Sequence, residues 1–332
     1  MSESVYIIAE AGTNHNGSLS VAKELVDVAV KAGADSVKFQ LISPSGLYLP
    51  KFYKDGVYED NSVFQKRTDT MLSDSEYRVI AEYCCEKKIS FSASVFDKKG
   101  VDLLDDLNVP YIKVASCDLN NSKFLREISG RGRKVVISTG MGSLCEIEQA
   151  IADVFSEGNT DIVLMHCVSV YPCPMERMNL GFIQVLRNTF GFPVGLSDHT
   201  LDNHASAIAI GMGVEWIEKH FTLDRSQSGF DHSYALEPEG LSGFIKDMRS
   251  SRDACERQHI KVGAEEELVK QRARRSLYAA RIINHGEKVK ESDILVVRPE
   301  GHLKPNDIPR LIGKTARKVI HQYESISWDM FE

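Results

Sequence analysis

The sequence predicts an α/β protein, a (β/α)8 barrel followed by a small β-rich domain. The 332 residues suggest two domains, since one domain usually takes ~100–200 residues. Apolar runs alternate with segments of helical periodicity over the first part of the chain, for about 255 residues, which matches a (β/α)8 barrel. The last sixty or so residues carry shorter strand-like runs and the opposite net charge, which marks a separate module.

Eight short apolar runs are the predicted barrel strands. In chain order they are Val5–Ala9, Ser36–Gln40, Ser90–Ser94, Tyr111–Ala115, Lys134–Ser138, Asp161–His166, Pro193–Leu196 and Glu215–Lys219. Most are followed by a segment with helical spacing of its apolar residues. A doubly wound open sheet has the same local pattern and is the alternative fold.

Two of the predicted helices have clear start and stop signals. After the first strand, apolar residues recur at i, i+3, i+6 and i+7 from Leu19, with Ser18 as N-cap and Gly33 as the stop. A second helix over 146–154 is preceded by the capping candidate Ser143.

The segment between Leu41 and Ser73 interrupts this alternation, because it is much longer than an ordinary βα connection. It is rich in aromatic residues, namely Tyr48, Phe52, Tyr53, Tyr58 and Phe64. After the C-terminal end of a strand, such a segment would overhang the barrel mouth as a lid. A packed Ω-loop explains it equally well.

The domain boundary is predicted within the polar stretch that includes Glu265, Glu266 and Glu267. A long helix from Gly240 to Leu268 leads into this stretch. The predicted domains are the catalytic barrel at 1–262, a linker at 263–273 and a small β-rich domain at 274–332. Strand-like runs in the last part are Leu277–Ile283, Ile294–Val297 and Lys318–Ile320, separated by turns such as His285-Gly286-Glu287.

Charge is unevenly distributed along the chain. Residues 271–332 hold 12 Lys and Arg against 8 Asp and Glu, a net charge of +4, whereas the preceding 270 residues hold 28 against 39, a net of −11. A basic tail can bind nucleic acid or membrane, or form a small domain that meets an anion. Its arginines are not interleaved with stacking aromatics, so nucleic acid is a weak option.

Composition excludes several other classes of protein. With 42% hydrophobic and 26% charged residues, 10 prolines and 23 glycines, the chain is not disordered or low-complexity. No run approaches the ~18 apolar residues of a membrane span. The beginning of the chain has no basic, signal-like region, and the seven cysteines form no CxxC pair. A reduced, cytoplasmic protein without a membrane or nucleic-acid partner is expected.

Lysines and hydroxyls at the predicted strand ends indicate an anion site. Catalytic residues of a barrel lie at the C-terminal ends of its strands, where this chain places Lys38, Lys113, Ser94, Ser116 and Ser138. Lysine is rarely buried without a partner, so a phosphate or carboxylate ligand is favoured over structural ion pairs. No GxGxxG follows a strand and there is no P-loop, so nucleotide binding has no local support.

Two histidines end the last two predicted strands and indicate a metal site. His199 and His220, with Glu10 and Asp198 able to assist, suit a divalent cation with open coordination positions. In the loop that follows, Asp231 and its neighbour His232 either orient a polyhydroxyl substrate or belong to a solvated loop. Cys167 and Cys173 are assigned no chemistry, because no Cys–His spacing suggests a nucleophile.

These strand ends together resemble the sialic acid synthase family, enzymes that condense phosphoenolpyruvate with an N-acetylated hexose. The resemblance runs almost from end to end and in order. Its segments are 7–17 (IIAEAGTNHNG), 37–40 (VKFQ), 136–141 (VISTGM), His166-Cys167 with Tyr171-Pro172, 195–200 (GLSDHT) and 218–222 (EKHFT).

The resemblance implies a TIM barrel followed by an antifreeze-like (SAF) domain, in a homodimer whose small domains are swapped. It also implies site residues. Phosphoenolpyruvate would be bound by Lys38, Ser94, Lys113, Ser116, Ser138 and Ser197. The sugar or the reacting centre would be met by Glu10, Gln40, Tyr171 and Asp231. His199 and His220 would hold Mn²⁺ or Mg²⁺, and Arg298 would reach the acyl-amino group across the dimer.

Three positions depart from the family pattern. Ser94-Val95-Phe96 stands where many members have Thr-Pro-Phe, and Ser169 stands where bacterial members often have Asn. Asp118 replaces a common Glu and is counted among the predicted substrate-binding residues. These differences concern contacts with the substrate rather than the class of reaction.

The expected activity is therefore the synthesis of a nine-carbon, sialic-acid-type keto sugar acid with release of phosphate. Glu10, Lys38 and Lys113 are the expected catalytic residues, and the acceptor is N-acetylmannosamine or a close relative. One alternative is another metal-dependent synthase that makes a seven- or eight-carbon keto acid from an aldose. The other is a sugar-binding relative that has lost catalysis.

Overall fold

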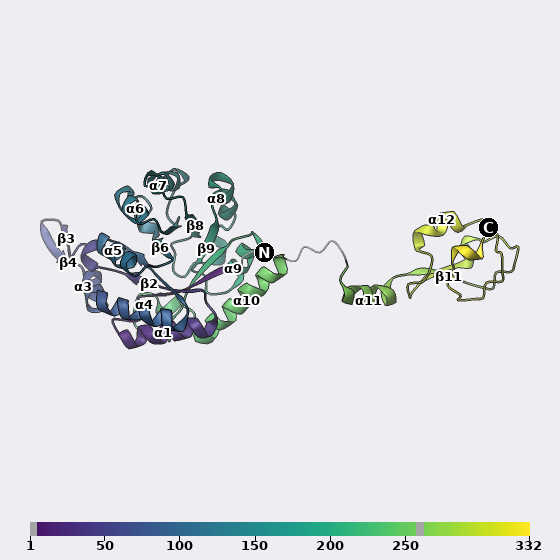
Figure 1. Ribbon diagram of the computed structural model, residues 1–332, viewed down its shortest axis with the longest axis horizontal. Helices are drawn as coiled ribbons and strands as arrows, with labels where there is room; N and C mark the ends of the chain where they lie inside the picture. Colours follow the sequence, from purple (N-terminus) through teal and green to yellow (C-terminus); the bar gives the residue numbers. More distant parts are fainter. Residues whose placement is uncertain (1–4, 257–261) are drawn as a thin grey trace. The chain divides into compact units, whose positions relative to one another are not determined.

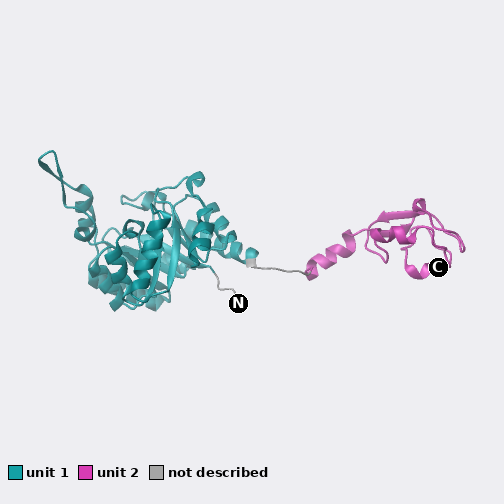
Figure 2. Cartoon of the chain, turned by 90° about the horizontal axis from the view of Figure 1, so that it is seen from above, with its two compact units in different colours: residues 1–257 teal, residues 258–332 magenta. Residues whose placement is uncertain are grey.

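The computed structural model describes residues 5–256 and 262–332, which fall into two compact units, 1–257 and 258–332 (Figure 2). The first unit is a closed barrel of eight parallel strands in the order β1-β10-β9-β8-β7-β6-β5-β2. The barrel prediction is confirmed, and the open sheet is excluded. The strands are β1 Tyr6–Gly12, β2 Ser36–Leu41, β5 Ser90–Val95, β6 Tyr111–Val114, β7 Lys134–Ser138, β8 Ile162–Cys167, β9 Val194–Asp198 and β10 Trp216–His220.

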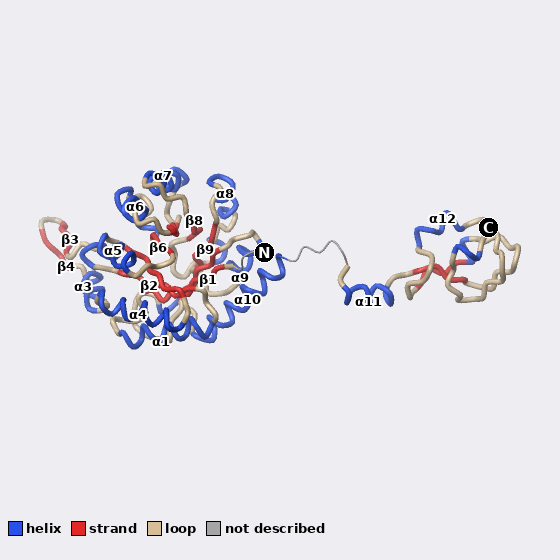
Figure 3. The backbone as a smooth tube through the Cα atoms, viewed as in Figure 1, coloured by secondary structure: helices blue, strands red, loops and turns tan. Residues whose placement is uncertain are grey.

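One helix of the outer layer follows each barrel strand (Figures 1 and 3). These helices are α1 Leu19–Ala32, α4 Asp74–Lys87, α5 Lys98–Asp106, α6 Ser122–Ser129, α7 Leu144–Ser156, α8 Phe182–Phe190, α9 His204–Gly211 and α10 Pro238–Glu256. The start and stop signals predicted for α1 and the start signal predicted for α7 are present in the structure. The Ser18 hydroxyl accepts from Val21 N–H, Gly33 closes α1 at φ 83°, and Ser143 forms a capping box with Glu146.

The two ends of the barrel interior differ in chemistry. One end is filled by apolar and aromatic side chains, among them Ile8, Tyr111 and Met165, with Trp216 packed against them. At the other end the strand register brings polar residues side by side. Glu10 is level with both Lys38 and His220, and Ser94 is level with Lys113. The packed end therefore fixes the strands whose opposite ends carry the charged residues.

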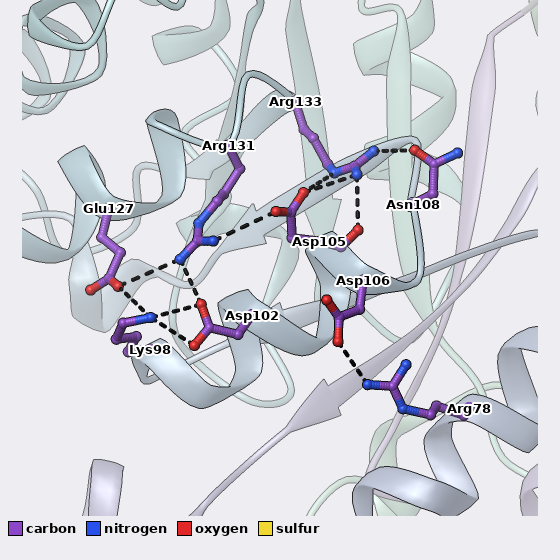
Figure 4. Close-up of polar contacts among 9 residues, drawn as sticks. All are labelled: Arg78, Lys98, Asp102, Asp105, Asp106, Asn108, Glu127, Arg131 and Arg133. Carbon is purple, nitrogen blue, oxygen red and sulfur yellow. Dashed lines mark hydrogen bonds and ion pairs between the residues drawn. The ribbon is translucent and has the colours of Figure 1, made fainter.

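A network of ion pairs joins α5 to α6 and the turn after it on the outside of the barrel (Figure 4). Asp102 accepts from both Lys98 and Arg131, whereas Arg133 binds Asp105 and Asn108. Exposed ion pairs are individually weak, so the network supports helix packing that the apolar core already determines.

The segment between β2 and α4 is neither an unstructured lid nor a simple loop. It contains α2 Pro44–Leu47, a hairpin of β3 Lys51–Lys54 and β4 Val57–Asp60, and α3 Ser62–Asp69. The hairpin projects away from the barrel in both views (Figures 1 and 2). The aromatic rings of Tyr53 and Tyr58 pair with each other, with centroids 5.0 Å apart, instead of packing on the barrel.

The second unit has a small core of its own and little regular structure. β11 Ser276–Ala279 pairs antiparallel with β12 Ile294–Val297, and α12 Ile308–Leu311 lies later in the chain. The core is formed by Leu277, Ala279, Ile283, Val289, Leu303, Leu311, Ala316, Ile320, Ile326, Met330 and Phe331. The predicted strand at Lys318–Ile320 is only a single bridge between Ile283 and Ile320.

The predicted long helix from Gly240 to Leu268 is wrong in part. α10 ends at Glu256, and a second helix, α11, spans Ala264–Ala273, whereas residues 257–261 of the prediction lie outside the described residues. Most of the predicted linker, 263–273, is therefore helical. Three glutamates in the first turn of α11 and Lys270 and Arg272 in its last turn favour a helix by complementing its dipole.

Two expectations from composition can be compared with the structure. All seven cysteines lie in the described residues and are free. Across 5–256 and 262–332, no helix is long and apolar enough to cross a membrane.

Candidate active site

Four buried charges form the centre of the site at the polar end of the barrel. Lys38 Nζ lies 2.8 Å from Glu10 Oε2 and 3.6 Å from Glu218 Oε2. Lys113 Nζ lies 3.2 Å from the same Glu218 oxygen. At most 4% of each of these side chains is exposed. Two cations and two carboxylates from β1, β2, β6 and β10 therefore balance one another away from water.

Burial and mutual charge decide how these groups titrate. Burial raises the pKa of Glu10 to about 7, although Lys38 opposes the shift. For Glu218 burial also favours the neutral acid, but Lys113 and Lys38 outweigh it and hold the pKa well below its usual range. Burial would lower the pKa of Lys38, yet the two carboxylates raise it overall. Of the two carboxyl groups, Glu10 is therefore the one that exchanges a proton near neutral pH.

Hydroxyl and amide groups surround the four charges and orient them. Lys38 Nζ donates to Ser94 Oγ at 2.9 Å, and Ser197 Oγ donates to Glu218 Oε1 at 2.8 Å. Gln40 Nε2 donates to Glu10 Oε1 at 3.0 Å. One oxygen of each carboxylate is therefore held by a neutral donor, whereas Glu10 Oε2 is paired with Lys38.

A cavity of about 340 Å³ opens over this cluster. It is lined by Glu10, Lys38, Gln40, Ser94, Lys113, Ala115, Ser116, Cys117, Ser138, Met141, Cys167, Ser169, Tyr171, Ser197, His199, Glu218 and His220. Gly140 keeps one wall open, since a Cβ there would lie 2.6 Å from Ser169 Oγ and 2.7 Å from Ser116 Oγ. The cavity thus offers two ammonium groups and several hydroxyls to one small anionic ligand.

The two predicted metal ligands face the same cavity. The rings of His199 and His220 have centroids 5.5 Å apart, and Tyr171 packs on His199 at 4.1 Å. His199 Nδ1 lies 3.0 Å from Val168 O, which orients the ring and leaves Nε2 available. His220 Nδ1 is buried and lacks a hydrogen-bond partner, and burial lowers the pKa of this imidazole. Imidazole nitrogens without a hydrogen-bond partner fit a divalent cation.

Asp198 does not belong to this pair, contrary to the sequence-based expectation. Strand alternation turns it to the outside of the barrel, where Lys219 Nζ lies 3.0 Å from Asp198 Oδ2 and Ser206 Oγ donates to the same oxygen at 2.6 Å. Within 5–256 and 262–332, no group of three or more His, Cys, Asp or Glu side chains has metal-binding geometry. The two imidazoles would leave most coordination positions to water or substrate.

Two other predicted residues, Asp118 and Asp231, do not line the cavity. Asp118 is buried beside it, and its Oδ1 accepts from Asn121 Nδ2 at 3.1 Å. Asp231 accepts from Tyr234 Oη at 2.6 Å through Oδ1, whereas its Oδ2 is buried without a partner. Arg298 follows β12 in the second unit and is exposed.

Glu218 is the main residue that the sequence-based assignment missed. It stands two residues before His220 on β10, so the period of a strand places both side chains on the inner face, with Lys219 on the outer face. That alternation could have identified Glu218 from the sequence. Its pairing with Lys113, on the opposite side of the barrel, could not be read from spacing.

The chain matches known protein families along most of its length. Residues 25–259 match the model of the NeuB family, and residues 274–332 match that of the SAF domain. The chain is 34% identical to N,N'-diacetyllegionaminic acid synthase of Campylobacter jejuni, over 96% of this chain and 98% of that one. It is 32% identical to pseudaminic acid synthase of the same species, over 95% and 93%.

A solved relative has the same architecture. The crystal structure of an N-acetylneuraminic acid (sialic acid) synthetase from Leptospira borgpetersenii matches with a TM-score of 0.72 and 31% identity. The match covers 80% of this chain and 90% of that one.

Replacing Glu218 with Gln tests the balance of the buried charges. We expect the Glu218→Gln variant to be destabilised by about 3 kcal/mol, because removing one partner leaves an uncompensated buried cation. Inorganic phosphate should restore part of this loss and stabilise the variant more than the wild type, since an anion can replace the carboxylate. Thermal unfolding with and without phosphate measures both effects. Equal stabilisation of the two proteins by phosphate would contradict the prediction.

Proposed function

The chain belongs to the NeuB family of phosphoenolpyruvate-using condensing enzymes, and we propose that it joins phosphoenolpyruvate to an N-acetylated hexose. The acceptor is N-acetylmannosamine or a close relative, such as a diacetamido-trideoxyhexose. The product is a nine-carbon keto sugar acid, and inorganic phosphate is released. The relatives above, which make different sialic-acid-type products, differ by only two percentage points in identity, so overall similarity does not select the acceptor.

One observation carries the proposal: an anion cradle and an imidazole pair open into the same cavity. Phosphoenolpyruvate presents a phosphate and a carboxylate, which match the ammonium groups of Lys38 and Lys113 with the serine hydroxyls around them. The imidazoles of His199 and His220 line the same cavity, and the carbonyl end of an open-chain sugar would meet them there. Holding both reactants in one cavity supplies much of the rate enhancement.

The reaction forms one carbon–carbon bond and replaces the phosphate-bearing oxygen at C2 of phosphoenolpyruvate with an oxygen from water. C3 of phosphoenolpyruvate bonds to the aldehyde carbon C1 of the sugar, whose oxygen takes up a proton and becomes a hydroxyl. Water adds at C2 and loses its protons, and phosphate departs as the C2 ketone forms. The chain's own residues fix both reactants and handle the proton of the water. Glu10 is placed to accept that proton, because its raised pKa matches a base that works near neutral pH.

A divalent metal, Mn²⁺ or Mg²⁺, is part of the proposal. His199 and His220 would hold it, and it would supply Lewis-acid polarisation of the sugar's aldehyde oxygen. Tyr171, stacked on His199, and Gln40, bonded to Glu10, border the position of the sugar.

The SAF unit is proposed to complete the site in a homodimer. Arg298 is exposed at the end of β12, and its guanidinium can donate to the acyl-amino oxygen of the acceptor. A charge of +4 on residues 271–332 against −11 on the rest favours docking of this unit on the barrel of a second copy.

Phosphate release with a panel of acceptors tests the proposed activity. We expect phosphate from phosphoenolpyruvate only when N-acetylmannosamine, its 6-phosphate or a diacetamido-trideoxyhexose is present. Chelation with EDTA should abolish release and added Mn²⁺ should restore it, and the His220→Ala variant should show no such restoration. Release with an unacetylated pentose or tetrose phosphate would favour the shorter keto acids. No release with any sugar would refute the assignment.

The pH dependence of kcat/KM tests the role of Glu10. A base acts only when deprotonated, so kcat/KM should rise with pH through about 7, the pKa of Glu10. The Glu10→Gln variant should lose this ionisation and at least a hundredfold in kcat, a typical loss for a general base. Glu86→Gln, an exposed carboxyl group on α4, is the matched control. Near-normal turnover by Glu10→Gln with phosphoenolpyruvate still bound would contradict the role.

Mixing two inactive variants tests whether a site is shared between copies. Arg298→Ala and His220→Ala should each be inactive alone. After subunit exchange, mixed dimers should regain about a quarter of wild-type activity, because half of the dimers are mixed and each contains one intact site. Native mass spectrometry establishes that the mixed dimers form. Mixed dimers without activity would show that Arg298 does not serve a second copy.

A further inference from the structure

Arg67 of α3 is a buried cation at the point where three loops meet. Its side chain belongs to the segment between β2 and α4, and the residue is only 8% exposed. Nη1 donates to Thr13 Oγ1, in the loop after β1, at 2.6 Å. The guanidinium carbon lies 3.5 Å from the centre of the Phe230 ring, in the loop after β10. One side chain therefore joins the loops that follow β1 and β10 to the segment after β2.

The position of Arg67 is fixed by close backbone packing. Gly17, in the loop after β1, has φ 78°, and a Cβ there would lie 3.2 Å from the Cα of Thr70 at the end of α3. Glycine is thus required both by its dihedral angle and by this contact. The end of α3 rests directly on the loop after β1, so the reach of Arg67 toward Phe230 is set by the backbone.

Burying this guanidinium has a cost that ion pairing does not offset. Among the described residues no carboxylate forms an ion pair with Arg67, and its buried Nε has no hydrogen-bond partner. One hydrogen bond and one aromatic face do not fully offset the free energy of removing a cation from water, so this burial does not favour folding by itself. Its placement is consistent with a role in holding the two loops in one arrangement.

The loop held by Phe230 carries Asp231, whose free oxygen lies close to Glu10 and Gln40 of the cavity lining. A Cβ on Gly12 would lie 2.8 Å from Asp231 Oδ2, 3.5 Å from Gln40 Nε2 and 3.7 Å from Glu10 Oε1. The carboxylate therefore lies next to the Glu10–Gln40 pair. Oδ2 is buried and unpartnered, which leaves it ready to accept a hydrogen bond from a ligand.

The other side of Asp231 is already fixed. His232 Nδ1 lies 2.7 Å from Thr222 Oγ1, and its Nε2 lies 3.2 Å from Asn16 Nδ2. Phe230, on the preceding side, is 37% exposed, and its ring face rests on the guanidinium. Asn16 Nδ2 also donates to Ser228 O at 3.2 Å, so loss of Arg67 would loosen the loop at Phe230 and leave its other contacts in place.

We propose that Arg67 is a positioning residue that holds the Phe230–Asp231 loop so that Asp231 Oδ2 accepts a hydroxyl of the sugar acceptor. The inference rests on the proposed function for the identity of that ligand. It gives the long segment after β2 a task different from that of a lid. The segment acts through Arg67 in the last turn of α3, and not through the hairpin.

Kinetics with each substrate in turn test the proposal. Arg67→Met keeps the aliphatic stem and removes the cation and its donors. We expect it to raise the KM for the accepting sugar at least tenfold, while the KM for phosphoenolpyruvate stays within twofold. Arg67→Lys keeps the charge over Phe230, and its KM for the accepting sugar should lie between those of Arg67→Met and the wild type. Arg78→Ala, which removes an exposed arginine of α4 paired with Asp106, is the matched control and should change neither constant.

Hydrogen exchange tests the positioning separately from the activity. Amides of residues 224–237 should exchange about tenfold faster in Arg67→Met than in wild type, with exchange of the barrel strands unchanged. Thr13→Val and Phe230→Leu each remove one contact of the guanidinium and should shift exchange in the same direction, which keeps the test open if Arg67→Met folds poorly.

The outcomes separate this inference from the proposed function. If wild type releases no phosphate with any sugar, the function fails, yet the exchange measurement still decides whether Arg67 holds the loop. Unchanged exchange at 224–237 in all three variants would overturn the positioning role. Faster exchange together with equal rises in both KM values would overturn the selective link to the sugar.

Discussion

The balance of four buried charges is the constraint on which the rest of this site depends. Two lysines cannot be held in the barrel interior without carboxylates, and two carboxylates cannot be held there without cations. Glu218 pairs with Lys113 and, at a longer distance, with Lys38, and it stays ionised. Glu10 is then the carboxyl group whose pKa lies near neutral pH. An anionic substrate enters a cluster whose lysines already have carboxylate partners, so its binding requires redistribution of these contacts.

The barrel supplies this balance with little help from its loops. Parallel strands place Glu10, Lys38 and His220 at one level, and the aromatic packing at the far end keeps them there. The segment after β2, the loop after β1 and the loop after β10 converge on Arg67, so parts far apart in the chain are held together beside the barrel.

The eight strands, the caps of α1 and α7 and most residues of the cavity could be predicted from the sequence, because each depends on local periodicity or on a strand end. The expectation that Asp198 assists the metal site was wrong, because successive side chains of a strand point to opposite faces. Asp198 lies on the outer face, where it forms an ion pair with Lys219. The single long helix predicted before the second unit is two helices, because the backbone is extended at Gly263, the N-cap of α11.

What the sequence by itself determined is the set of chemical groups: two lysines, two imidazoles, the hydroxyls beside them and a basic second domain, in an order typical of one family. Only the tertiary structure decided how they are paired. Glu218 with Lys113, and Arg67 with Thr13 and Phe230, are contacts between segments more than fifty residues apart in the chain. Barrel closure and loop packing bring such residues together, and neither leaves a trace in the spacing of residues along the chain.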